Sequence, residues 1–153
     1  MGQVISQEAF RATARQSDAE PVQSFLQGQA AADLRDGGGD TPLIIAATNG
    51  HEACVRALLD GRADVNAFSN SDKTALFAAA RNGHVAIVQL LIQRGADVHQ
   101  KDDDGYNALL WACEEGHTTC VAALLGAGAD VNDPLESDFT ALMVAAQEGH
   151  VDV

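Results

Sequence analysis

The chain has 153 residues and a net charge of −13, with nine Lys and Arg against 22 Asp and Glu, and 46% of its residues are hydrophobic. A chain this acidic repels nucleic-acid backbones and anionic membrane surfaces, which excludes both as partners of the protein as a whole. No apolar run approaches the roughly 20 residues that span a bilayer, and the first residues lack the pattern of a secretory signal. We therefore expect an intracellular, mainly cytoplasmic protein; a nuclear pool stays open, as does a membrane-associated pool held by a lipid anchor.

The first seven residues form a tail in front of the periodic part of the chain. They begin Met-Gly-Gln-Val-Ile-Ser, which fits the short pattern Met-Gly-x-x-x-Ser/Thr that precedes N-myristoylation at Gly2. One acyl chain gives only marginal membrane attachment, and no basic cluster follows to supply a second signal. Acylated and unmodified forms of Gly2 both stay open, and membrane contact is expected only from the acylated form.

Four short motifs recur at intervals of 33 residues with nothing inserted between them. They are Thr41-Pro-Leu-Ile, Thr74-Ala-Leu-Phe, Asn107-Ala-Leu-Leu and Thr140-Ala-Leu-Met. A Gly-His pair follows each motif at the same offset, and an Ala-Asp-Val-Asn or Ala-Asp-Val-His sequence closes the first three segments. Self-similarity at a fixed period of this size indicates a repeat architecture, in which each unit buries its apolar face against its neighbours.

Each unit is predicted to be a pair of antiparallel helices followed by a projecting turn. In residues 74–106, Thr74 opens a helix that runs through Asn82, Gly83 ends it, and a second helix covers residues 85–93. Gly95 ends the second helix, because glycine tolerates positive φ. The turns are rich in Asp, Asn, Ser and Gly, and they cover residues 34–40, 67–73, 100–106 and 133–139.

The repeat domain is expected to cover residues 8–153. A fainter copy of the pattern with a polar outer side predicts an N-terminal capping repeat. The domain divides into this cap at 8–40, full repeats at 41–73, 74–106 and 107–139, and an incomplete repeat at 140–153. Because the second helix of the last repeat is cut short, we expect the chain to be a fragment of a longer protein.

These motifs resemble the ankyrin repeat family over nearly the whole chain. The resemblance implies an all-α solenoid of stacked antiparallel helix pairs with projecting β-turn or hairpin loops. Two departures are present: proline follows the opening residue only at Pro42, and an apolar residue replaces the family's histidine in all four motifs. These are Ile44, Phe77, Leu110 and Met143. Packing is expected to replace a polar turn network at these positions.

The histidine and cysteine columns are expected to be structural. The histidines are His51, His84, His117 and His150. Successive copies should lie about 8 to 10 Å apart, too far to share a metal, so each is expected to hydrogen-bond backbone at the start of a second helix. The cysteines are Cys54, Cys113 and Cys120. Their odd number and an apolar helix column favour buried free thiols over a disulfide or metal site.

Two loops resemble ligand sites without completing them. Asp36-Gly-Gly-Gly-Asp40 lacks the Lys-Ser/Thr pair and the preceding strand of a phosphate loop. Asp102-Asp103-Asp104-Gly105 resembles the start of a calcium loop, but Cys113 stands at the twelfth position in place of Glu, and a solvated turn is favoured. No nucleophile-elbow or dinucleotide motif is present, so we predict no metal, no cofactor and no enzymatic activity.

The family resemblance implies that a partner protein binds to a concave face made of the turn tips and the outer residues of the first helices. The candidate partner-binding residues are Phe68, Asn70, Lys73, Arg81, Asn82, Lys101, Asp103, Asp104, Tyr106, Glu114, Glu115, Glu136, Phe139, Gln147 and Glu148. Carboxylates around Tyr106 and Phe139 suit a partner segment that carries Lys or Arg beside an apolar residue. A hydrophilic surface with no partner at this end is the alternative. Trp111 aligns with apolar residues and is expected to pack in the core.

A non-catalytic protein-binding module or scaffold is the function that the sequence favours. The alternatives are a regulatory or targeting domain of an enzyme whose catalytic part lies beyond residue 153, and an adaptor tethered to a membrane through acylated Gly2. The resemblance adds one modification site: Asn66 and Asn132, with His99 in the same column, stand where some ankyrin proteins are hydroxylated. A side chain that ties down the turn is favoured there.

Overall fold

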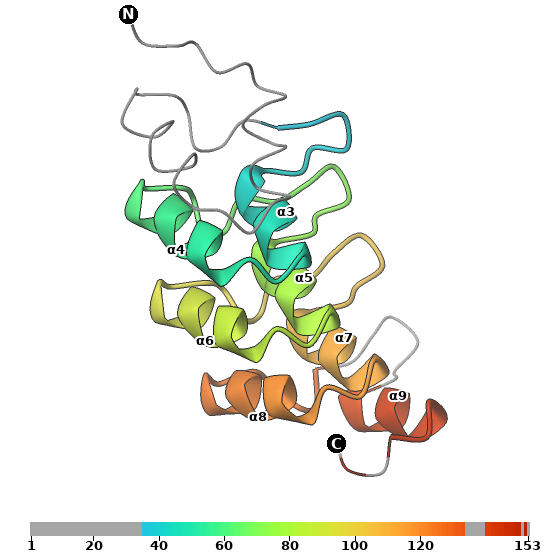
Figure 1. Ribbon diagram of the computed structural model, residues 1–153. Coiled ribbons are helices and arrows are strands. Elements are labelled where there is room, and N and C mark those ends of the chain that lie inside the picture. Colours follow the sequence, from blue (N-terminus) through green and yellow to red (C-terminus); the bar gives the residue numbers. More distant parts are fainter. Residues whose placement is uncertain (1–34, 134–139, 151, 153) are drawn as a thin grey trace, which may run out of the picture. The chain divides into compact units, whose positions relative to one another are not determined.

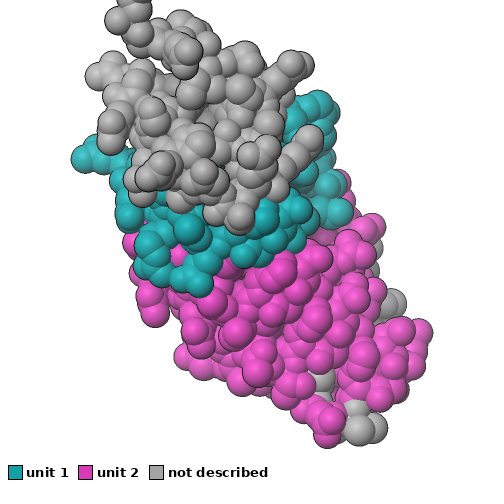
Figure 2. All heavy atoms as spheres, viewed as in Figure 1, with its two compact units in different colours: residues 1–75 teal, residues 76–153 magenta. Residues whose placement is uncertain are grey.

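The computed structural model describes residues 35–133, 140–150 and 152 (Figure 1). The chain divides into two compact units, residues 1–75 and 76–153, which are coloured separately in Figure 2. The predicted tail with Gly2, most of the predicted capping repeat, and the candidate residues Glu136 and Phe139 lie outside the described residues.

The first unit contains the helices α3 (Pro42–Thr48) and α4 (Glu52–Asp60), which pack against each other. Helix α3 begins after Thr41, whose Oγ1 accepts a hydrogen bond from the Ile44 amide at 3.3 Å. Pro42 occupies the first turn, where an amide would have no partner within the helix. The threonine motif therefore works as a helix start, and the apolar residues behind it form the core.

The second unit contains α6 (Val85–Gln93), α7 (Ala108–Glu114), α8 (Thr118–Gly126) and α9 (Ala141–Gln147). Helix α5 (Ala75–Arg81) begins at the boundary between the units. In this unit the first helices α7 and α9 pack against each other, and so do the second helices α6 and α8, which gives two rows (Figure 1). Helix α7 also packs against α8, which joins the rows. Alanines with no exposed surface, such as Ala108 and Ala112, allow this close approach.

The predicted helix boundaries are confirmed to within one residue. Helix α5 covers Ala75–Arg81, between the predicted ends at Thr74 and Asn82, and α6 covers the predicted residues 85–93. Gly83 follows α5 with φ +73°, and the next amide, of His84, donates to the Ala79 carbonyl at 2.9 Å.

The all-α repeat fold predicted from the sequence is confirmed. In the described part of the chain, the β-structure is one isolated bridge between Phe68 and Thr74. No helix in residues 35–133 or 140–150 is long and apolar enough to span a membrane.

Burial at the apolar position of the repeat motif differs along the chain. Ile44, Phe77 and Leu110 are buried as predicted, whereas Met143 is 53% exposed and its neighbour Leu142 is 63% exposed. The packing prediction is therefore wrong for Met143. Among the described helices, α7 packs against both α8 and α9, whereas α9 packs chiefly against α7.

Candidate functional site

Each of the three projecting turns that the structure describes, at residues 35–40, 67–73 and 100–106, is organised by one short side chain that carries an oxygen. The three side chains are Asp36, Ser69 and Asp102, which stand 33 residues apart. Each accepts hydrogen bonds from the amides two and four residues later, at 2.9–3.3 Å. The residues between these amides are therefore presented outward in a repeated geometry.

The two loops that resembled ligand sites use this same geometry internally. In the glycine loop, the amides of Gly38 and Asp40 donate to the Asp36 carboxylate, so they are occupied rather than available to an anion. In the aspartate loop, Asp102 is only 7% exposed, and its Oδ2 accepts a hydrogen bond from Trp111 Nε1 at 2.9 Å. The prediction of a solvated turn is therefore wrong for Asp102, whose buried carboxylate is hydrogen-bonded on both oxygens.

Trp111 is half-buried at the surface of the second unit, and the prediction of core packing is wrong for it. Its column otherwise holds Ile45, Ala78 and Val144, so the indole exceeds the volume of the shared position and reaches the edge of the repeat. The Tyr106 ring lies against it, with ring centroids 4.7 Å apart and an interplanar angle of 36°. Offset aromatic contacts of this kind stabilise both rings.

Arg81 completes this group from the preceding repeat. Its guanidinium carbon lies 4.3 Å from the Trp111 ring centroid, and its Nε lies 3.3 Å from Glu115 Oε1. We call the set the Trp111 cluster; it consists of Arg81, Asp102, Tyr106, Trp111, Glu114 and Glu115. Burial raises the pKa of the Tyr106 phenol, and the charge of Glu114 and a side-chain hydrogen bond with it raise that pKa further.

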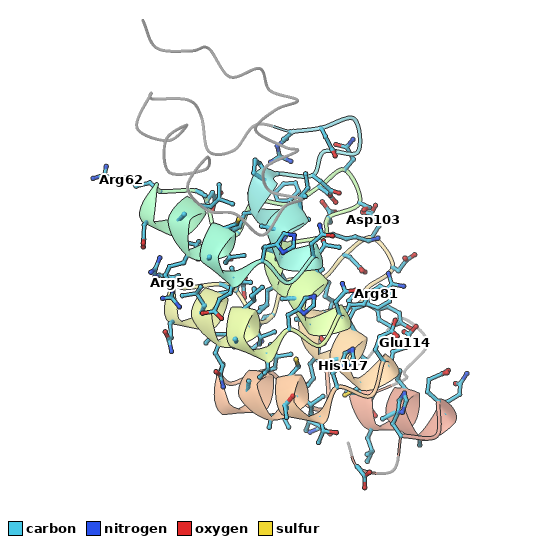
Figure 3. The ribbon with its side chains drawn as sticks, viewed as in Figure 1. Arg56, Arg62, Arg81, Asp103, Glu114 and His117 are labelled. Carbon is cyan, nitrogen blue, oxygen red and sulfur yellow. The ribbon has the colours of Figure 1, made fainter. Side chains whose placement is uncertain are left out.

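The backbone beneath the cluster is fixed by histidines of the following repeats. His117 Nε2 lies 2.9 Å from the Arg81 carbonyl oxygen, and His150 Nε2 lies 2.9 Å from the Glu114 carbonyl oxygen. Figure 3 shows Arg81, Glu114 and His117 in the same part of the second unit. These two histidines bond backbone as predicted, but the bond links neighbouring repeats, and His117 makes no side-chain bond at the start of its own helix.

In the first unit, the candidate residues lie on the turn that follows α4. Phe68 is exposed beneath the Arg35 guanidinium, whose carbon lies 5.5 Å from the ring centroid, and Arg35 also donates to the Phe68 carbonyl. The backbone amide of Asn70 donates to the Gly38 carbonyl at 3.1 Å, which ties this turn to the preceding one. Lys73 is exposed.

The other candidate residues of the second unit do not belong to the Trp111 cluster, and each has its own contacts or is exposed. Lys101 pairs with Asp133 at 2.7 Å, and the Asn82 side-chain amide donates to the Ala78 carbonyl at 2.8 Å. Asp103 and Asp104 are exposed on the turn that carries Tyr106. Gln147 and Glu148 are exposed at the end of α9. The structure therefore brings Arg81, Tyr106, Glu114 and Glu115 into one cluster, and it adds Asp102 and Trp111 to them.

The remaining columns are structural. The three cysteines are buried free thiols, which confirms the prediction. Among the described residues, no group of three His, Cys, Asp or Glu could hold a metal ion. In the column of Asn66, His99 and Asn132, the Asp two residues earlier accepts the backbone amide at 2.9 Å. An aspartate side chain therefore helps to tie down this turn in all three repeats.

A comparison with known protein families matches nearly the whole chain. The matching family is described as "Ankyrin repeats (3 copies)", and it matches residues 10–102 and 96–153. No curated protein gives a significant match.

Proposed function

The chain belongs to the ankyrin repeat family, whose members are generally protein-binding and typically non-catalytic, and we propose that it binds a basic, partly apolar segment of another protein at the Trp111 cluster. An intracellular location is part of this proposal. The three free cysteines support it, because thiols stay reduced inside the cell.

The observation that carries the proposal is an aromatic pair set among exposed carboxylates. The rings of Tyr106 and Trp111 are half-buried and in contact. Three exposed carboxylates lie within four residues of them in the sequence, namely Asp103, Asp104 and Glu115. Residues 102–153 contain 11 Asp and Glu and no Lys or Arg. Carboxylates at the rim of an interface steer a cationic partner, and partly buried aromatics supply binding energy.

The test is the binding of a short labelled peptide that contains Arg, Lys and Leu, measured by fluorescence polarisation. Tyr106→Ala and Glu114→Lys should each weaken binding by roughly tenfold, because one removes an aromatic contact and the other reverses a rim charge. Raising the salt concentration should also weaken binding, since the steering charges are screened.

The matched control is Asp60→Lys, which makes the same change in charge at an exposed position on α4. It should leave the affinity nearly unchanged. An equal loss in Asp60→Lys and Glu114→Lys would mean that net charge alone attracts the peptide. Unchanged binding by Tyr106→Ala and Glu114→Lys, with both variants folded by circular dichroism, would contradict the proposal.

A further inference from the structure

The Trp111 cluster already holds a cation that belongs to the chain itself. The Arg81 guanidinium carbon lies 4.3 Å from the indole centroid, and Arg81 Nε lies 3.3 Å from Glu115 Oε1. An aromatic face attracts the cation through its quadrupole, and a carboxylate at the edge accepts the guanidinium N–H groups. These contacts show how this surface receives an arginine side chain.

The receiving surface is fixed independently of Arg81. Trp111 Nε1 donates to Asp102 Oδ2 at 2.9 Å, and Asp102 is held in turn by the amides of Asp104 and Tyr106 at 3.1 and 2.9 Å. The Tyr106 ring lies against the indole at 4.7 Å. The indole therefore stays in position when the guanidinium leaves, and a preorganised site of this kind binds a ligand with a smaller loss of entropy.

Arg81, in contrast, is held loosely at its tip. Its side chain is 45% exposed and that of Glu115 is 41% exposed, and an exposed ion pair contributes little to stability. Its backbone is fixed separately, because the Arg81 carbonyl bonds His117 Nε2 at 2.9 Å. The guanidinium can swing away on its long side chain while α5 keeps its place.

We propose that Trp111 and Glu115 form an arginine-binding site whose resident occupant is Arg81, and that an arginine of the partner protein takes the place of Arg81. This inference rests on the proposed function and adds two points to it. The basic residue that matters is arginine, because a planar guanidinium stacks on an indole while it bonds a carboxylate, and lysine has a compact, strongly hydrated ammonium. Arg81 itself is a competitor of the partner and makes no contact with it.

The test uses two short labelled peptides that differ only in Arg or Lys beside Leu. Arg81→Gln should tighten binding of the arginine peptide by roughly fivefold to tenfold, because it removes a competing exposed ion pair and cation–π contact. The lysine peptide should gain much less. Trp111→Leu in the Arg81→Gln background should abolish the gain. In the wild-type chain, the emission of Trp111, its single tryptophan, should change on binding of the arginine peptide.

The matched control is Arg94→Gln, which removes the same charge from an exposed position at the end of α6. A gain shared equally by Arg94→Gln and Arg81→Gln, or by both peptides, overturns the inference. Weaker binding by Arg81→Gln also overturns it, since Arg81 would then be a direct contact.

Failure of this inference can be told apart from failure of the proposed function. Binding that depends on Tyr106 and Glu114, without any gain in Arg81→Gln, overturns the arginine site alone. Binding of neither peptide by the wild-type chain or by any variant overturns both.

Discussion

At the scale of single residues, the second helices end in the same backbone conformation with different amino acids. Gly95 and Gly128 have φ of +88° and +92°, and Arg62, in the same column, has φ +66°. This left-handed region favours glycine, because a Cβ there crowds the following carbonyl. The chain reads Gly61-Arg62 in one repeat and Arg94-Gly95 in the next, so the first of these glycines stands one residue too early.

Arg62→Gly should therefore stabilise the protein. We expect the free energy of unfolding to rise by about 1 kcal/mol, measured as a higher urea midpoint at an unchanged slope. Gly95→Ala should lower it by about 1 kcal/mol; beyond the two chain neighbours nothing lies within 4 Å of the added Cβ, so this cost comes from the backbone conformation. The control is Arg62→Ala, which keeps a Cβ at the strained position. A gain as large in Arg62→Ala as in Arg62→Gly would attribute the effect to the arginine side chain and contradict the explanation.

At the scale of elements, neighbouring repeats of the second unit are joined where a first helix ends. His117 reaches back to the Arg81 carbonyl, and its imidazole lies so close to Gly83 that a Cβ there would come within 2.8 Å of the ring. Gly83 also has φ +73°, so glycine is required for both conformation and space. The same arrangement recurs one repeat later between Gly116 and His150.

Gly83→Ala should cost more than Gly95→Ala, because it adds a steric clash to the same backbone strain. We expect a loss of about 2 to 3 kcal/mol in the free energy of unfolding, against about 1 kcal/mol for Gly95→Ala. His117→Ala alone should cost about 1 kcal/mol through its lost hydrogen bond.

The double variant of Gly83 and His117 distinguishes clash from strain. Removing the imidazole relieves the clash, so the two losses should sum to more than the double variant loses, by about 1 kcal/mol in a double-mutant cycle. Losses that add to within about 0.5 kcal/mol would show that the two residues are not coupled.

At the scale of the whole molecule, folding is linked to pH on the alkaline side. Burial raises the pKa of the Cys113 thiol from 9.0 to about 11. Burial also raises the pKa of Cys120, partly offset by a hydrogen bond with Thr119, and that of Tyr106, where Glu114 adds to it. The native state therefore binds these protons more tightly than the unfolded chain. The resulting stability is fully present below about pH 9 and is lost as the pH rises toward 11.

Replacing Cys113 should flatten this dependence. Cys113→Ala is the matched change, because the same column holds buried alanines at Ala47 and Ala80. Between pH 9 and 11, the wild type should lose up to about 1.4 kcal/mol per pH unit more than Cys113→Ala, measured by urea unfolding at each pH. Equal slopes for the two proteins would show that the thiol does not contribute to the loss.

The sequence by itself determined the features that repeat. The sequence predicted the period of 33 residues, the helix ends at Gly83 and Gly95, and the buried cysteines. Each of these features depends on a local preference that is copied in several repeats. The column of Asp36, Ser69 and Asp102 was equally readable as three short oxygen-bearing side chains, and could have identified the turn geometry.

The tertiary structure alone decided which unlike residues meet. Arg81, Asp102 and Trp111 converge although they occupy different columns, and their contacts span 30 and 9 residues. A column compares each residue with its copies, whereas side-chain contact depends on what the neighbouring repeat presents at a different position. The column of Ile45, Ala78 and Val144 therefore predicted that Trp111 packs in the core. Its size and an indole N–H that needs an acceptor bring it to the surface instead, where the Arg81 guanidinium of the preceding repeat lies over it.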